Sequence, residues 1–213
     1  MIADFSYLYK HFEKISALHL PGVGAHVKMM PAERKKMLQN IDFDKITPKE
    51  SAVMAILHPI KGETNLLFIE RSIYEGVHSG QIAFPGGKRE REDADLYQTA
   101  CRETCEEVGI LSNQLEQIKT LTQVYVPPSN FMITPFLAFH PENIKLTLDE
   151  IEVKSAMSIS LSDLTNTQNQ QLVEMKASYG TLSNMPAYVI NERIVWGATA
   201  MIVAEIMDLL QNI

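Results

Sequence analysis

The 213-residue sequence has few of the features that mark secreted or membrane-spanning proteins. Its only two cysteines, Cys101 and Cys105, are four positions apart, a spacing that would close almost no loop and that favours two thiols packed within one helix. No apolar run approaches the roughly 20 residues that span a bilayer, and the N-terminus lacks a signal-peptide core. We therefore expect a cytoplasmic protein with no membrane segment.

Basic residues are also scarce, with 19 Lys and Arg against 26 Asp and Glu and a net charge of −7. This balance lacks the positive surface with which general nucleic-acid-binding proteins neutralise phosphates. It predicts no nucleic acid partner. An anionic small-molecule substrate would need cations that are brought together locally.

Two parts of the chain differ in pattern. Residues 4–16 have apolar side chains at helical spacing, and residues 31–40 form a short basic helical segment after a Pro-Gly break. We predict that residues 1–48 are an N-terminal helical extension, which either docks on the rest of the chain or pairs two chains in a homodimer. Residues 49–213 are predicted to form one α/β domain.

Within this domain, strand and helix patterns alternate. Strands are predicted at 51–60, 65–72, 80–84, 121–126, 132–140, 152–161, 187–190 and 193–197, and helices at 95–108 and 198–210. Strands interleaved with a few helices indicate a mixed sheet with helices on both faces.

The helix at 95–108 ends with three glutamates. Glu103, Glu106 and Glu107 lie just before Gly109, a typical left-handed helix stop. On a helical wheel the later two fall within about 60° of Glu103, so we expect all three carboxylates to point away from the core. A helix C-terminus disfavours negative charge, and a bound Mg²⁺ or Mn²⁺ would reverse that penalty. A solvated acidic face is the alternative.

This segment resembles the Nudix box of Nudix hydrolases. The residues that carry the likeness are Gly87, an acidic residue, and Arg102-Glu103-x-x-Glu106-Glu107-x-Gly109-Ile110. The resemblance implies an α/β/α sandwich and hydrolysis of a phosphoanhydride with Mg²⁺ or Mn²⁺. It implies that Glu103, Glu106 and Glu107 hold the metal. It also implies that Arg102 orients the site through Asp93, although eight residues rather than the usual seven separate these two.

The preceding segment, LFIERSIYEGVHSGQIAFPGGKRERED, resembles the signature of the coenzyme A pyrophosphatase branch of this family. The residues in register are Leu67, Arg71, Ser72, Gly80 and Phe84-Pro85-Gly86-Gly87. The branch has the longer box, and its implied reaction converts coenzyme A or a derivative to 3′,5′-ADP and 4′-phosphopantetheine. Phe68 and Ile69 depart from the branch, and Gly76 replaces an arginine that is a plausible phosphate contact.

The Gly76 departure leaves other substrates open. A Nudix hydrolase of another nucleoside diphosphate derivative, such as ADP-ribose, a dinucleotide or an oxidised nucleotide, is the main alternative. A non-catalytic ligand sensor of the same fold is a third interpretation. The presence of Glu103, Glu106 and Glu107 argues against it, because non-catalytic members commonly lack such carboxylates.

Further residues are candidates for catalysis and binding. The predicted substrate-binding residues are Arg71, Gly86, Gly87 and Lys88. Arg71 lies at a strand end, and its planar guanidinium suits bidentate phosphate binding. Glu152 precedes a predicted strand, where a loop acid could serve as metal ligand or catalytic base; an ordinary surface glutamate is equally consistent with the pattern. Trp196 is expected in the core.

Overall fold

A computed structural model describes residues 2–42, 45–72, 80–177 and 180–213. The helices in this part of the chain are α1 (Phe5–Lys10), α2 (Phe12–Ala17), α3 (Val23–His26), α4 (Ala32–Gln39), α5 (Leu96–Val108), α6 (Leu161–Thr165) and α7 (Gly197–Leu210). The strands are β1 (Lys49–Ile60), β2 (Glu63–Arg71), β3 (Ile82–Ala83), β4 (Gly86–Lys88), β5 (Glu116–Thr120), β6 (Val124–Val126), β7 (Phe131–Phe139), β8 (Val153–Ser160), β9 (Gln170–Ala177), β10 (Gly180–Ile190) and β11 (Arg193–Trp196).

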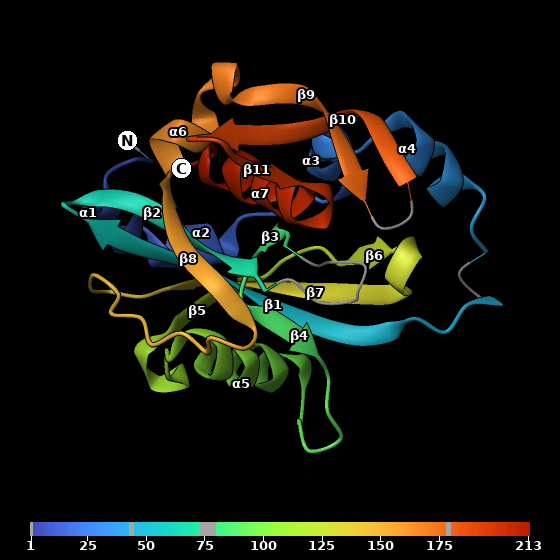
Figure 1. The fold of residues 1–213 in the computed structure, drawn as a ribbon. Helices are drawn as coiled ribbons and strands as arrows, with labels where there is room; N and C mark the ends of the chain where they lie inside the picture. The colour runs from blue at the N-terminus through green and yellow to red at the C-terminus, as the bar shows by residue number, and fades with distance from the viewer. Residues whose placement is uncertain (1, 43–44, 73–79, 178–179) are drawn as a thin grey trace.

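Strand β1 lies at the centre of an eight-stranded sheet (Figure 1). The order is β3-β2-β1-β7-β5, with β4 beside β1, β6 beside β7 and β8 beside β2. β1 runs parallel to β7 and antiparallel to β2 and β4, so the sheet is mixed, as predicted. β9, β10 and β11 form a second, antiparallel sheet.

Side chains of β1 alternate between two apolar cores because successive residues of a strand point to opposite faces. Met54 and Ile56 pack on the side of α5 with Val108, whereas Ala55 and Leu57 pack on the side of α7. Each large side chain buried in this way contributes roughly 1.5–3 kcal/mol. Figure 1 shows α5 and α7 on opposite faces of the sheet, which is the predicted α/β/α arrangement.

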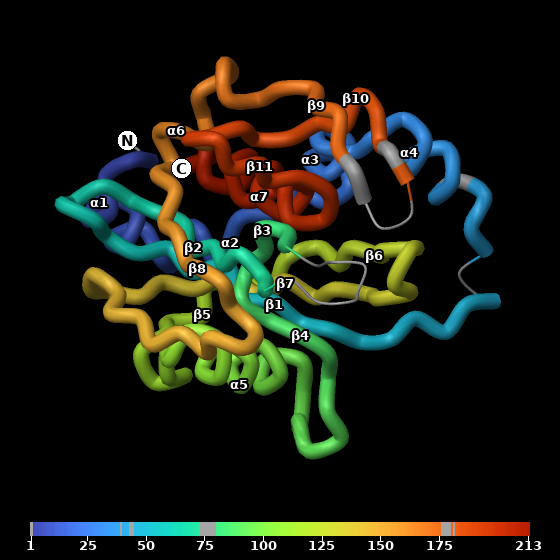
Figure 2. Tube along the Cα trace, viewed as in Figure 1, coloured from blue at the N-terminus to red at the C-terminus, as the bar shows by residue number. Residues whose placement is uncertain are grey.

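The N-terminal helices pack into the core on the α7 side. The single helix expected there is two helices, because the backbone turns at His11 between α1 and α2. Phe5, Leu8 and Ile15 are buried. Figure 2 shows the trace then passing along α7 to reach α4 beside β10. The N-terminal segment therefore docks on the rest of the chain. That it also pairs two chains in a homodimer stays a prediction, which light scattering can test.

Some strands differ from the sequence prediction. β5 and β9 were not predicted, β10 is much longer than 187–190, and β6 covers only the end of 121–126. β5 and β9 expose many of their polar side chains, so their apolar residues do not form a buried run. Such edge strands are stabilised by pairing with a neighbour more than by their own composition. Among the described residues, no helix has the length and hydropathy needed to span a bilayer.

Candidate active site

The site is built on α5, whose ends are defined by local contacts. Asp95 caps the first turn by accepting a hydrogen bond from the Gln98 backbone N–H at 2.8 Å. Gly109 ends the helix in the left-handed region, with φ of 74°. A Cβ at this position would also lie 2.9 Å from Thr147, so both backbone angle and space require glycine.

A loop crosses the C-terminal end of α5 and satisfies its last carbonyl groups. The Thr147 N–H donates to the Val108 carbonyl at 3.0 Å, and the Asp149 N–H donates to the Glu107 carbonyl at 3.1 Å. Three residues later the same loop carries Glu152. The hydrogen bonds that complete the helix therefore also bring a third acidic residue to its end.

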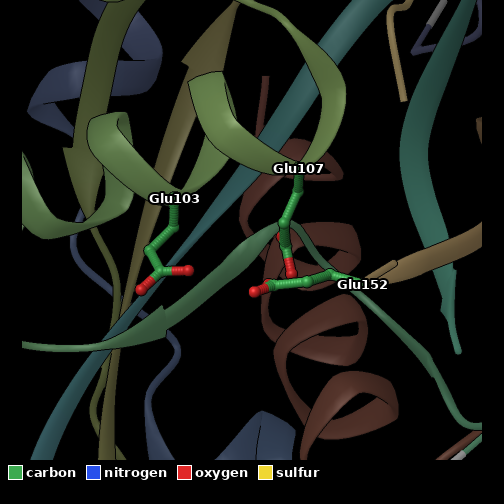
Figure 3. A group of neighbouring side chains, drawn as sticks. All are labelled: Glu103, Glu107 and Glu152. Carbon is green, nitrogen blue, oxygen red and sulfur yellow. The ribbon is translucent and has the colours of Figure 1, made fainter. Parts of the chain in front are cut away.

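Three carboxylates meet at this point. One oxygen from each of Glu103, Glu107 and Glu152 lies within 4.8 Å of the others. Figure 3 shows that the first two descend from α5, while Glu152 reaches in from the chain before β8. Glu152 is exposed, Glu103 is half-buried and Glu107 is fully buried. The expectation that all the helix carboxylates point away from the core is therefore wrong for Glu107, because β4 and Arg71 cover it.

Glu107 is held by two donors. The Gly86 N–H donates to Oε2 at 2.8 Å, and Arg71 Nη1 donates to Oε1 at 3.1 Å. Burial nevertheless raises the pKa of Glu107 to about 7, against the opposing effects of Arg71 and the Gly86 N–H. A Cβ on Gly86 would lie 2.3 Å from the Ala52 carbonyl oxygen, so only glycine lets this donor approach the carboxylate.

Glu103 occupies the space that Gly87 leaves open. A Cβ on Gly87 would lie 2.4 Å from the Glu103 carboxyl carbon. Burial raises the pKa of Glu103, while Arg102 acts in the opposite direction. The two glycines of the Gly-Gly turn thus determine where the side chains of Glu103 and Glu107 can lie.

Arg102 links the helix to the turn before it. Its Nε and Nη2 donate to the two oxygens of Asp93 at 3.0 and 3.1 Å, so the predicted pairing is present despite the extra residue. This bidentate contact holds the pKa of Asp93 well below its usual range. Arg102 Nη1 also donates to Glu103 and, at 2.9 Å, to Glu106. The Glu106 side chain is 56% exposed and lies outside the group of three carboxylates.

A pocket of about 770 Å³ lies beside the carboxylates, which do not line it themselves but are reached through Arg71 and Gly86, two lining residues that bond to Glu107. All four predicted substrate-binding residues line it: Arg71, Gly86, Gly87 and Lys88. Trp196 also lines it and is half-buried, so the expectation of a core tryptophan is wrong. Trp196 lies at the junction of β11 and α7, where its side chain forms part of the pocket wall. The apolar periodicity of the sequence does not reveal this position. Gly76 lies outside the described residues.

The donor set suits a hard divalent cation. It consists of carboxylate oxygens without histidine or thiolate, which are ligands that Mg²⁺ and Mn²⁺ accept and zinc sites rarely use alone. In the part of the chain that the structure describes, this is the one such group of acidic, histidine or cysteine residues. Two carboxylates whose pKa values are raised by burial gain most from a nearby cation.

Comparison with known proteins places the chain in the Nudix family, whose NUDIX domain matches residues 48–177. The chain is 30% identical over 168 residues to the mitochondrial coenzyme A diphosphatase NUDT8 of Homo sapiens, covering 76% of this chain and 70% of that protein. It is 31% identical over 151 residues to the uncharacterized Nudix hydrolase NudL of Yersinia enterocolitica, covering 70% and 76% of the two. The solved structure of the Nudix hydrolase RenU from M. Smegmatis shares the fold, with a TM-score of 0.54 and 15% identity over 78% of this chain and 88% of that one.

These comparisons confirm the predicted family, its coenzyme A pyrophosphatase branch and the Nudix fold. The chain is a Nudix pyrophosphohydrolase of the class that acts on small nucleotide substrates. Nudix hydrolases generally use a divalent metal ion, in agreement with the prediction of a metal cofactor.

Proposed function

We propose that this protein is a Mg²⁺- or Mn²⁺-dependent hydrolase of the pyrophosphate bond in coenzyme A or its derivatives, with 3′,5′-ADP and 4′-phosphopantetheine as products. The observation that carries the proposal is the group of Glu103, Glu107 and Glu152 next to a pocket with a cationic rim. The 30% identity to a coenzyme A diphosphatase supports the choice of substrate.

Glu103, Glu107 and Glu152 would hold the cation. When bound, it supplies positive charge to the pyrophosphate oxygens and lowers the pKa of a coordinated water. The sequence predicted Glu106 as a ligand. We propose Glu152 in its place, because its carboxylate faces the other two whereas that of Glu106 contacts Arg102.

The remaining groups of the site position the substrate. Arg71 lines the pocket beside Glu107, so its guanidinium can bind a phosphate oxygen there, and Lys88 at the end of β4 can bind another. Arg102 keeps Glu103 in place through its bond to Asp93. Hydrolysis forms a bond from water oxygen to phosphorus and breaks the bridging P–O bond. Glu152, the most exposed of the three glutamates, would accept the proton of that water on the oxygen that does not hold the cation, and the bridging oxygen would leave on the second phosphate product.

Turnover of coenzyme A and ADP-ribose with Mg²⁺ and with Mn²⁺, with products identified by mass, tests the substrate. We expect coenzyme A to give 3′,5′-ADP and 4′-phosphopantetheine at the higher kcat/KM. Higher turnover of ADP-ribose would favour the alternative, a hydrolase of another nucleoside diphosphate derivative, which the glycine at position 76 also favours.

Glu152→Gln and Glu106→Gln form a matched pair that tests the ligand assignment. Both side chains are exposed acids close to α5, and only Glu152 belongs to the group of three. We expect Glu152→Gln to lower kcat/KM about a hundredfold and Glu106→Gln to lower it less than about tenfold. If Glu106→Gln caused the larger loss of kcat/KM, Glu106 rather than Glu152 would be the metal ligand.

A further inference from the structure

The pocket beside the carboxylates is closed on its far side by segments outside the NUDIX match at 48–177. These segments are α4 with Arg34 and Met37, residues 182–185 of β10, and residues 196–199 around the start of α7. The family's shared region therefore provides the reaction end of the pocket. At the far wall, parts of the chain outside that match meet residues 126–131 of the matched region.

Arg34 is held on this far wall. Its side chain is half-buried, and its Nη2 donates to the Tyr125 backbone carbonyl at 2.5 Å. A guanidinium has five N–H donors that point along several directions, so it can hold a carbonyl oxygen and a bound anion at once. The contact fixes the cation of α4 against β6.

Positive charge is concentrated around the pocket although the protein is acidic. Among the described lining residues the cations are Arg34, Arg71 and Lys88, and Glu33 is the one carboxylate. Between the cations the walls include apolar side chains such as Phe131 and Trp196. Such a lining suits a ligand that carries separate anionic groups together with a flat or apolar part.

Arg34 and Arg71 are anchored far apart. Arg34 bonds to Tyr125 on β6, whereas Arg71 Nη1 lies 3.5 Å from the carbonyl of Gly86 on β4. From β6 the sheet passes through β7 and β1 to β4, which is three strand spacings or on the order of 14 Å. The two anchors are too far apart for both guanidinium groups to bind one phosphate, so Arg34 is placed to bind a different one from Arg71.

We infer that Arg34 determines specificity by binding a phosphate monoester that is separate from the diphosphate, such as the phosphate on the 3′ oxygen of the ribose in 3′,5′-ADP. The inference rests on the proposed function, because that function puts the diphosphate at the Arg71 end. The N-terminal helices thereby take part in substrate selection.

The first test compares coenzyme A with dephospho-coenzyme A, which lacks only that phosphate, as substrates of the wild type, Arg34→Gln and Lys35→Gln. Lys35 is the matched control, being an exposed cation on the same helix that does not line the pocket. We expect Arg34→Gln to lower kcat/KM for coenzyme A between about tenfold and a hundredfold, and to leave dephospho-coenzyme A within about twofold. For Arg34→Lys we expect a kcat/KM for coenzyme A between those of the wild type and Arg34→Gln.

If Arg34→Gln lowered kcat/KM equally for both substrates, Arg34 would have only a structural role and the inference would be overturned. A wild type with equal kcat/KM for coenzyme A and dephospho-coenzyme A would also overturn it. The melting temperatures of the three variants show whether α4 remains docked. Calorimetric binding of 3′,5′-ADP and AMP gives a readout that needs no turnover. A preference for 3′,5′-ADP that Arg34→Gln abolishes supports the inference even if coenzyme A is not hydrolysed, and binding without that preference contradicts it even if coenzyme A is hydrolysed.

Discussion

Glu107 and Glu205 are both fully buried glutamates on helices that flank the central sheet, yet their surroundings differ. Glu205 of α7 accepts hydrogen bonds from the backbone N–H groups of Gly22 and Thr122 at 3.1 Å and from the Thr122 hydroxyl at 2.5 Å. His26 Nε2 lies 3.1 Å from Oε2, the oxygen that also accepts the Thr122 N–H. Burial acts to raise the pKa of Glu205, but these contacts outweigh it and lower the pKa.

Glu107 has fewer partners, and its pKa is raised to about 7. The contrast separates a carboxylate whose charge is well compensated by hydrogen bonds from one whose charge is not. Glu205 joins α7 to the N-terminal segment through Gly22 and His26, and it needs nothing more. Glu107 is buried with incomplete compensation, a state that two neighbouring carboxylates worsen and a cation would relieve. The following predictions test this difference, from the largest expected effect to the smallest.

Glu107→Gln should lower kcat/KM on the order of a thousandfold, because the neutral amide removes a buried charge from the metal group. At pH 5, where the raised pKa keeps Glu107 protonated, the free energy of unfolding without metal should stay within about 1 kcal/mol of wild type. Steady-state kinetics and urea denaturation measure the two effects. A variant with normal turnover would remove Glu107 from the mechanism.

Glu205→Gln should have the opposite profile. The amide cannot accept all the hydrogen bonds that the carboxylate accepts, so the free energy of unfolding should fall by about 2–4 kcal/mol. Turnover per folded molecule should stay within about threefold, because Glu205 contacts none of the three clustered carboxylates. Loss of kcat at unchanged stability would contradict the structural role.

The two glutamates should also give opposite dependences of stability on pH in metal-free protein. The folded pKa of Glu107 lies above its unfolded value of 4.5, so the folded state binds more protons and stability is lost as pH rises from about 4.5 to 7. Relative to Glu107→Gln, the wild type should lose about 2–3 kcal/mol between pH 5 and 8. The folded pKa of Glu205 is lowered, so its contribution is present above 4.5 and is lost as pH falls below it. Denaturation series in EDTA check both signs, and parallel curves for wild type and Glu107→Gln would refute the first.

Added Mg²⁺ should stabilise the wild type and Glu205→Gln but not Glu107→Gln. At a free Mg²⁺ concentration about 30 times the Kd, the wild type should gain about 2 kcal/mol of stability. Glu205→Gln should show the same gain from a lower starting value, and Glu107→Gln should show little. Thermal melts with and without Mg²⁺ measure the increments. An equal gain in all three proteins would place the cation elsewhere.

The site could be predicted in part from local sequence. The limits of α5, the Gly109 stop and the pairing of Arg102 with Asp93 all depend on residues near one another in the chain. The burial of Glu107 could not be predicted from a helical wheel. It depends on Gly86 and Arg71, which β4 and β2 bring to the same point.

Long-range contacts account for the other differences. Glu152 faces Glu103 and Glu107 because a loop from beyond β7 bonds to the last carbonyls of α5. Trp196 became a pocket wall because β10 and α4 close the space in front of it. Neither result follows from the composition of the segment that carries the residue.

The sequence by itself determined the family, the helix with its acidic end and the mixed α/β architecture, because these follow from short motifs and from apolar periodicity. Only the tertiary structure decided which glutamates meet, which buried carboxylate is fully hydrogen-bonded, and which residues of the N-terminal segment reach the pocket. These depend on strand pairing and loop closure over long stretches of chain. Three acids at a helix end indicate a metal site, and packing decides which of them can share it.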